Sequence, residues 1–240
     1  MIHIMKILKL YILLSFAAGL AYLTSCGDDE PVTPSNDGDW VDLGLPSGTI
    51  WATRNVGASA PEEYGDYFTW GETEPKDYYD WSTYKWCNGN DETLTKYCTE
   101  SSLGYNGFVD NKTELDPKDD AACAHYPGGR MPSLEQIQEL CDSCTWQWTQ
   151  RNGVDGMLVT GPNGNTMFLP SAGSKDDYPQ SYDGPGGYYW SRTLSSYDSS
   201  SPFGLHFLSG SQYIGIWGDH WYIMSGCRYV GYNVRAVLDS

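Results

Sequence analysis

The sequence predicts an α+β domain with few short helices, antiparallel strands and long irregular loops. Three observations support this class. One segment carries both the cap and the apolar stripe of a helix, and several short segments bounded by Gly, Ser or Asp have the composition of strands. The long stretch from Glu72 to Gly129 has neither pattern.

The N-terminal residues 1–25 are predicted to be a lipoprotein signal peptide. Two lysines precede an apolar run from Leu10 to Leu23, which is shorter than the roughly 20 residues of a spanning helix. The run ends in Leu-Thr-Ser-Cys26, which resembles the lipobox of bacterial lipoproteins. The resemblance implies that Cys26 becomes the acylated N-terminal residue. An ordinary cleaved signal peptide followed by a chance cysteine is the alternative.

Residues 26–38 are predicted to be a flexible tether, because they are polar and rich in Pro and Asp. The acidic residues directly after Cys26 resemble the surface-export signal of lipoproteins in some Gram-negative gut anaerobes. This predicts a lipid-anchored protein on the outer face of the outer membrane, with retention in the periplasm as the alternative.

Residues 39–240 have the size of one domain. The formal net charge of the chain is −17, and removal of the signal peptide takes away two positive charges, those of Lys6 and Lys9, and no acidic residue. Nucleic acid and anionic lipid surfaces would be repelled by this charge. We therefore predict no nucleic-acid partner, and a membrane attachment that depends on the lipid.

The predicted strands occur in two groups. Two lie before the long loop region, and the others follow a hairpin in which Pro162–Asn165 supplies the turn. The predicted segments are residues 48–57, 67–72, 152–173 (the hairpin), 187–193, 204–210, 213–218 and 233–238.

One helix is predicted after Pro132. Ser133 and Gln136 have the spacing of a capping box. The residues that follow form one apolar stripe, because they recur at intervals of three and four: Leu134, Ile137, Leu140 and Cys141.

Six cysteines remain after Cys26, and an even number in an exported protein suggests disulfides. Cys87 and Cys98 are predicted to pair, because they are close in sequence. Cys141 and Cys144 form a C-x-x-C. A redox or zinc role for this motif is a weaker alternative, since no βαβ pattern and no second cysteine pair accompany it.

Two further patterns have a structural and a functional interpretation. The acidic stretch Val109–Asp120 is predicted to be a solvated loop rather than a calcium site, because it lacks the EF-hand spacing. Within it, Asp119 and Asp120 are predicted to bond backbone amides of the long loops or to cap a helix. Trp70 in the segment Trp70–Glu72 is predicted to pack in the core, with a glycan-stacking platform as the alternative.

Several motifs together resemble the Fib_succ_major (FISUMP) domain family. They are "VDLGLPSGTIWATRNVGASAPEEYGDYFTWGETEPK", "LDPKDDAACAHYPGGRMPSLEQIQEL", "YYWSRT" and the terminal "NVRAVL". That family is similar to the formylglycine-generating branch of the C-type-lectin fold. The resemblance implies a C-type-lectin-like domain over residues 39–240, with its N- and C-terminal strands paired near each other, and it implies no defined activity.

An enzyme is not predicted, and no catalytic residue, metal ligand or cofactor is assigned. The three histidines of the mature chain do not have metal-site spacing, and a nucleophile elbow and a P-loop are not present in the sequence. Sulfatase-activating relatives of the fold use a cysteine pair in the C-terminal half. Here that region offers only Cys227, which argues against an enzyme of the formylglycine-generating type.

The C-terminal segment is predicted to present a ligand-contacting surface within residues 192–232. It is dense in Tyr and Trp and broken by Gly and Ser, which is the composition of adaptable binding surfaces. Trp190 and Tyr232 are predicted to be core residues. The predicted contacts are Tyr197, Tyr213, Trp217, His220, Trp221 and Tyr229.

The segment is also similar in position and composition to the diversified region of retroelement-encoded variable proteins. The sequence thus predicts a surface lipoprotein that binds an unknown protein or glycan in adhesion or ligand capture. The alternative is a non-catalytic structural domain of the outer membrane.

Overall fold

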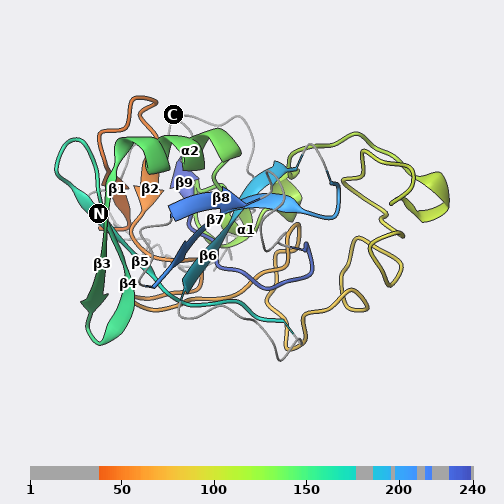
Figure 1. The fold of residues 1–240 in the computed structure, drawn as a ribbon, viewed down its shortest axis with the longest axis horizontal. Helices are drawn as coiled ribbons and strands as arrows, with labels where there is room; N and C mark the ends of the chain where they lie inside the picture. The colour runs from red at the N-terminus through yellow and green to blue at the C-terminus, as the bar shows by residue number, and fades with distance from the viewer. Residues whose placement is uncertain (1–37, 177–185, 196–197, 210–213, 218–226, 239–240) are drawn as a thin grey trace, which may run out of the picture.

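The computed structural model describes residues 38–176, 186–195, 198–209, 214–217 and 227–238. The strands of this part of the chain form three three-stranded sheets with antiparallel pairing, and two short α-helices accompany them. This arrangement confirms the predicted antiparallel strands and few short helices, and it is a β-rich or α+β fold. Figure 1 shows the sheets and the longer helix at one side of the molecule and the loops of residues 72–112 at the other.

The first sheet joins the two ends of the domain. β1 (Trp40–Asp42) pairs with β2 (Ile50–Ala52), and β2 pairs with β9 (Val237–Leu238). The expectation that the terminal strands lie close together is therefore confirmed. The Ala52 N–H also donates to the Ala236 carbonyl at 2.9 Å, which extends the contact beyond the strands.

The second sheet contains the predicted hairpin and one strand more. β4 (Val154–Thr160) and β5 (Thr166–Pro170) are the hairpin, and β3 (Thr145–Arg151) pairs with the other side of β4. A two-residue turn joins β3 to β4. Asn152 and Gly153 both have positive φ in this turn, 49° and 84°, as type I′ hairpins require.

The third sheet has the order β6-β7-β8 and comes from the C-terminal segment. Its strands are β6 (Gly186–Leu194), β7 (Pro202–Leu208) and β8 (Ile214–Trp217). All three were predicted from their composition and their Gly and Ser boundaries.

The predicted helix is α2 (Leu134–Ser143), and its capping box is formed. The Gln136 N–H donates to Ser133 Oγ at 3.2 Å, and the Ser133 N–H donates to Gln136 Oε1 at 2.8 Å. Ile137 and Leu140 are buried against the sheets, whereas Leu134 and Cys141 are only half-buried. α2 packs on β6, β7 and β8.

The segment 67–72 is not the strand that its composition predicted. It makes one isolated bridge, Phe68 with Tyr232. The Phe68 N–H donates to the Tyr232 carbonyl, but two residues later the Trp70 N–H donates to Arg228, four residues earlier on its partner. Between these two hydrogen bonds one segment moves on by two residues and its partner by four, so a regular antiparallel ladder cannot continue.

The stretch from Glu72 to Gly129 is irregular, as predicted, and holds only short helical turns. These are the 3₁₀ turns Tyr105–Gly107 and Pro117–Asp119 and the helix α1 (Ala121–His125). Two apolar clusters carry the core. One surrounds Trp70 and Trp190, and the other lies between α2, Trp51 and Phe207. No helix among the described residues combines the length and apolar character of a membrane span.

Candidate ligand-binding groove

The structure describes only part of the predicted contact surface. Tyr197, Tyr213, His220 and Trp221 lie outside the described residues, as does the predicted lipidation site Cys26. Trp217 is the last residue of β8, where its backbone pairs with Gly204, but its side chain is outside the description.

Tyr229 is the predicted contact whose side chain is described, and it packs inside the molecule. It is half-buried, and its ring lies 5.1 Å from that of Trp81, centroid to centroid. It packs against the cluster around Trp70 and Trp190 and against a smaller third cluster in the loop region, which consists of Tyr84, Leu94 and Cys98. In the described structure Tyr229 therefore supports the loops more than it faces a ligand.

Other aromatic residues of the C-terminal segment belong to the core. Trp190 and Tyr232 are 0% and 6% exposed, which confirms their predicted burial. Tyr188 and Tyr189 are buried beside them. The hydroxyl of Tyr189 donates to the Pro170 carbonyl at 2.8 Å, and burial raises its pKa to about 12. At these four positions the aromatic composition reflects the core and not a binding surface.

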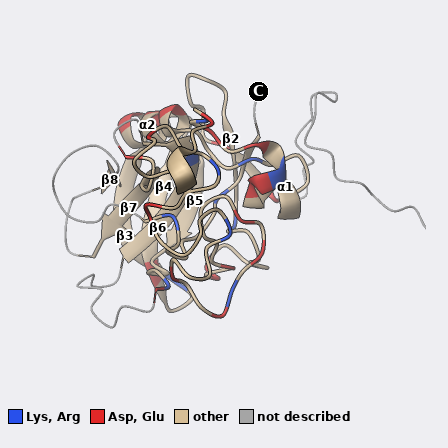
Figure 2. Ribbon diagram, turned by 90° about the vertical axis from the view of Figure 1, so that its right-hand side faces the viewer, with Lys and Arg blue, Asp and Glu red and all other residues tan. Residues whose placement is uncertain are grey.

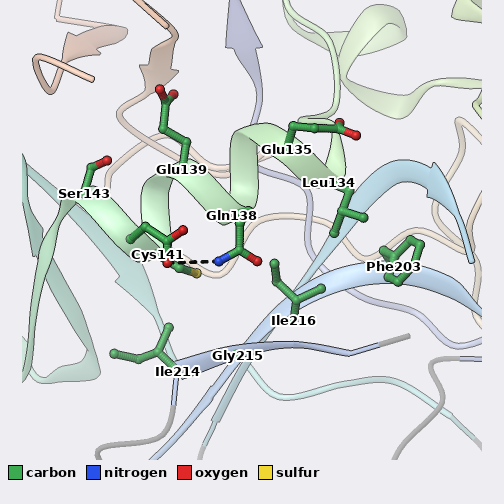
Figure 3. A pocket seen from close by; sticks show the side chains of 11 residues that line it. Leu134, Glu135, Gln138, Glu139, Cys141, Ser143, Phe203, Ile214, Gly215 and Ile216 are labelled. Atoms are coloured by element: carbon green, nitrogen blue, oxygen red, sulfur yellow. Dashed lines mark hydrogen bonds between the residues drawn. The ribbon is translucent and has the colours of Figure 1, made fainter. Parts of the chain in front are cut away.

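An open groove of about 870 Å³ lies between α2 and the β7–β8 edge of the third sheet. In Figure 3 α2 forms one wall, and Ile214 and Ile216 rise toward it from β8. The residues that line it are Leu134, Glu135, Gln138, Glu139, Cys141, Asp142, Ser143, Phe203, Ile214, Gly215 and Ile216.

The periodicities of a strand and a helix create the two walls. Ile214 and Ile216 are two residues apart on β8 and so share one face, and both are half-exposed. Leu134, Gln138 and Cys141 lie at i, i+4 and i+7 on α2 and so share one side of the helix. The groove is thus apolar along β8 and mixed along α2.

The helix wall is acidic at its rim. Glu135 and Asp142 are exposed, and Figure 2 shows acidic residues along α2. Asp142 accepts a hydrogen bond from Gln138 Nε2 at 3.0 Å. Glu139 points away from β8 in Figure 3, and it accepts from the Ser47 N–H at 2.8 Å.

The pKa values of both thiols of the cysteine pair beside the groove lie above the usual value for cysteine. Burial, helped by Asp142 and Cys144, raises the pKa of Cys141 to about 12. Burial and Glu139 raise that of Cys144 to about 11. The pair sits at the C-terminal end of α2, where the negative end of the helix dipole also disfavours a thiolate. Both effects therefore favour the thiol over the thiolate at neutral pH.

The predicted Cys87–Cys98 disulfide is not formed in the structure, where both thiols are free. The sulfur of Cys87 lies 3.2 Å from the Trp81 carbonyl, and that of Cys98 lies 3.1 Å from the Glu100 carbonyl. Each sulfur has its own backbone acceptor, so the short sequence separation did not by itself bring the two together.

The acidic stretch 109–120 is exposed over most of its length, as predicted for a solvated loop, but its last two residues are buried. Asp119 and Asp120 are 3% and 0% exposed. Asp120 caps α1, which was one of the two predicted roles. Its side chain accepts hydrogen bonds from the N–H groups of Ala122 and Cys123. Asp119 instead accepts from the Tyr97 hydroxyl at 2.6 Å and pairs with Lys96. The described residues contain no group of His, Cys, Asp and Glu side chains that could hold a metal ion.

Trp70 is a core residue, as predicted, and cannot stack on a glycan. It is 0% exposed, and its Nε1–H donates to the Ser191 carbonyl at 2.8 Å. Glu72 accepts from the Lys85 N–H at 2.8 Å and pairs with Lys76 at 2.7 Å, so it fixes the start of the long loop region.

The groove itself was not predicted, although part of it lies in the predicted segment 192–232. Phe203, Ile214 and Ile216 are in that segment but were not named, because the prediction rested on its Tyr and Trp residues. The helix wall comes from residues 134–143. One sequence signal for the helix wall existed. The apolar stripe of α2 includes Leu134 and Cys141 in addition to the buried Ile137 and Leu140, and so is wider than the buried face of the helix.

Comparisons with protein-family models, with curated proteins and with solved structures find no match to this chain. The resemblance to the FISUMP and C-type-lectin-like domains therefore stays a prediction.

Proposed function

We propose that this chain is a lipid-anchored lipoprotein of the outer membrane, exposed at the cell surface, whose C-type-lectin-like domain binds a protein or glycan ligand. Its contact surface would be the groove between α2 and β8 together with the C-terminal segment that surrounds β8. It is a binding module in adhesion or ligand capture and carries out no reaction.

The observation that carries this proposal is the groove. Its floor comes from Phe203, Ile214 and Ile216, which lie inside the segment with the composition of a binding surface. Tyr213 and Trp217 flank these strand residues directly in sequence. Concave sites with an apolar lining and a few polar groups are where proteins bind ligands. A purely structural domain would not need half-exposed isoleucines beside an open groove.

Cells that display the full-length protein provide the test. We expect them to adhere to at least one member of a panel of immobilised glycans and extracellular-matrix proteins. The double variant Ile214→Thr/Ile216→Thr, displayed at the same level, should lose that adhesion, because threonine keeps the β-branch but removes apolar contact area.

The variant Leu158→Thr is the matched control, because Leu158 is a half-buried aliphatic residue on β4, outside the groove. Equal adhesion by the parent and the groove variant would contradict the proposal. A parent that binds no member of the panel, combined with a leaky envelope on gene deletion, would favour the structural alternative.

A further inference from the structure

We infer that the groove between α2 and β8 takes an extended, cationic segment of a partner protein. Apolar side chains of that segment would lie on Ile214 and Ile216, and its Lys or Arg side chains would meet Glu135 and Asp142. The inference rests on the proposed function and names the chemistry of the ligand.

The charge of the groove selects a cation. Its lining residues include three carboxylates, Glu135, Glu139 and Asp142, and no Lys, Arg or His. The hydrogen bonds that Glu139 and Asp142 accept come from Ser47 and Gln138, which are neutral. Among the described residues none of the three carboxylates forms an ion pair. A cation at the rim of α2 would therefore meet carboxylates that are not already neutralised by a described Lys, Arg or His.

The shape of the groove favours an extended chain. Ile214 and Ile216 lie on one face of β8 and point toward α2 (Figure 3), so a chain that contacts both walls lies between the strand and the helix. In an extended peptide, alternate residues face the same side. Residues on one side would therefore reach Ile214 and Ile216, and residues on the other side would face α2, whose carboxylates Glu135 and Asp142 are among the residues that line the groove.

Charge also argues against two other occupants. A second copy of this chain would bring a formal net charge of −17 to an acidic groove. The chain's own tether carries Asp28, Asp29 and Glu30, and it would be repelled in the same way. A neutral glycan would leave Glu135 and Asp142 without a cation. A basic segment of another protein complements both the floor and the rim.

The test uses the mature chain with Cys26→Ser, which keeps every other residue and needs no detergent. The probe is a capped octapeptide of alternating valine and lysine, with binding measured by calorimetry at low ionic strength. Two matched peptides replace valine by serine or lysine by glutamate. We expect the valine–lysine peptide to bind on the order of tenfold more tightly than the serine–lysine peptide, and the glutamate peptide not to bind.

A second pair of variants tests the contribution of the carboxylates to peptide binding. Glu135→Gln/Asp142→Asn should weaken binding of the valine–lysine peptide by about three- to tenfold, as expected for two exposed ion pairs. The control Glu74→Gln/Asp77→Asn removes the same charge from two exposed residues of the long loop region, and it should change the affinity by less than about twofold.

Three outcomes would overturn the inference. They are equal binding of the valine–lysine and serine–lysine peptides, binding of the glutamate peptide, and equal losses in the two double variants. Self-association that the groove variants abolish would instead assign the groove to a second copy. If the groove variants lose adhesion to the panel while no peptide binds, the proposed function holds and only the chemistry of the partner is wrong.

Discussion

At the scale of single residues, buried polar groups hold the irregular part of this domain. Asp120 illustrates this, because its carboxylate accepts from Ala122 and Cys123 at the start of α1 and also from the Met131 N–H at 3.0 Å. One side chain thus connects α1 to the segment that leads into α2. Burial raises the pKa of Asp120, and the three N–H donors oppose that rise.

Asp120→Ala should lower the free energy of unfolding by about 2–4 kcal/mol, since it removes a helix cap and leaves buried donors unpaired. Chemical denaturation at neutral pH measures this. Asp91→Ala, at an exposed loop position, is the control and should change stability by less than about 0.5 kcal/mol. A loss below 1 kcal/mol in Asp120→Ala would show that water replaces the carboxylate.

At the scale of elements, the long loop region is ordered by charge where it lacks regular hydrogen-bonding. Lys96 lies 2.9 Å from Asp116 and also pairs with Asp119. Arg228 reaches the same turn from the C-terminal segment, where it donates to the Lys96 carbonyl at 2.9 Å. These contacts offset part of the conformational entropy that a loop of this length loses when it becomes ordered.

The Asp116 pairings predict an acid-sensitive loop region. Burial raises the pKa of Asp116, but hydrogen bonds from Lys112 and Lys96 outweigh this and bring it down to about 2. A pKa below the unfolded value contributes stability above about pH 4. That contribution, about 1–2 kcal/mol after allowance for partial exposure, is lost as the pH falls toward 2.

We therefore expect Asp116→Asn to be less stable than the parent at pH 6, with the difference shrinking as the pH falls from 4 to 2. Urea unfolding at each pH measures it. Glu74→Gln is the control, and its difference from the parent should not follow this course. A gap between parent and Asp116→Asn that stays constant with pH would contradict the role of these ion pairs.

At the scale of the whole molecule, Arg235 joins separate sheets. It is 1% exposed, and it donates to the carbonyls of Ala52 on β2 and Phe168 on β5 at 3.1 and 3.0 Å. A third bond reaches Asn55 Oδ1 at 2.9 Å. Burial lowers the pKa of Arg235 to about 10, and Tyr189 opposes this shift. The guanidinium thus fixes how the first and second sheets meet.

Arg235→Lys should destabilise the domain by about 3–5 kcal/mol, because a single ammonium cannot satisfy three acceptors that lie in different directions. Thermal unfolding measures the loss, and Arg151→Lys on the exposed end of β3 is the control. If Arg235→Lys unfolded at the parent's temperature, the joint between the sheets would depend on apolar packing alone.

Membrane attachment also belongs to the whole molecule. Cys26→Ser in the full-length protein should move the chain from the membrane fraction to the soluble fraction, because the predicted lipid is its expected anchor. Detergent partitioning measures this. Cys227→Ser, which leaves the predicted lipobox intact, is the control and should stay with the membranes. A Cys26→Ser protein that partitions like the parent would refute the lipoprotein prediction.

Local patterns in the sequence were enough to predict α2 with its cap, the β4–β5 hairpin and the strands of the third sheet. Each depends on the spacing of neighbouring residues. β3 was missed although Asn152-Gly153 marks a tight turn, because its alternating Trp and Gln residues carry little apolar signal. The prediction of a strand at 67–72 was wrong because its hydrogen bonds to the partner segment do not keep a regular register, and the register depends on a segment far away in sequence.

The tertiary structure alone decided which aromatic and acidic residues are buried. Composition cannot separate a core tyrosine from a contact tyrosine, so Tyr229 was predicted to contact a ligand although its ring packs against that of Trp81. The groove likewise has its floor and its wall about 70 residues apart in the chain. Strand and helix periodicities determined which side chains share a face, but only the packing of α2 against the third sheet determined that the two faces would leave an open, acidic-rimmed groove.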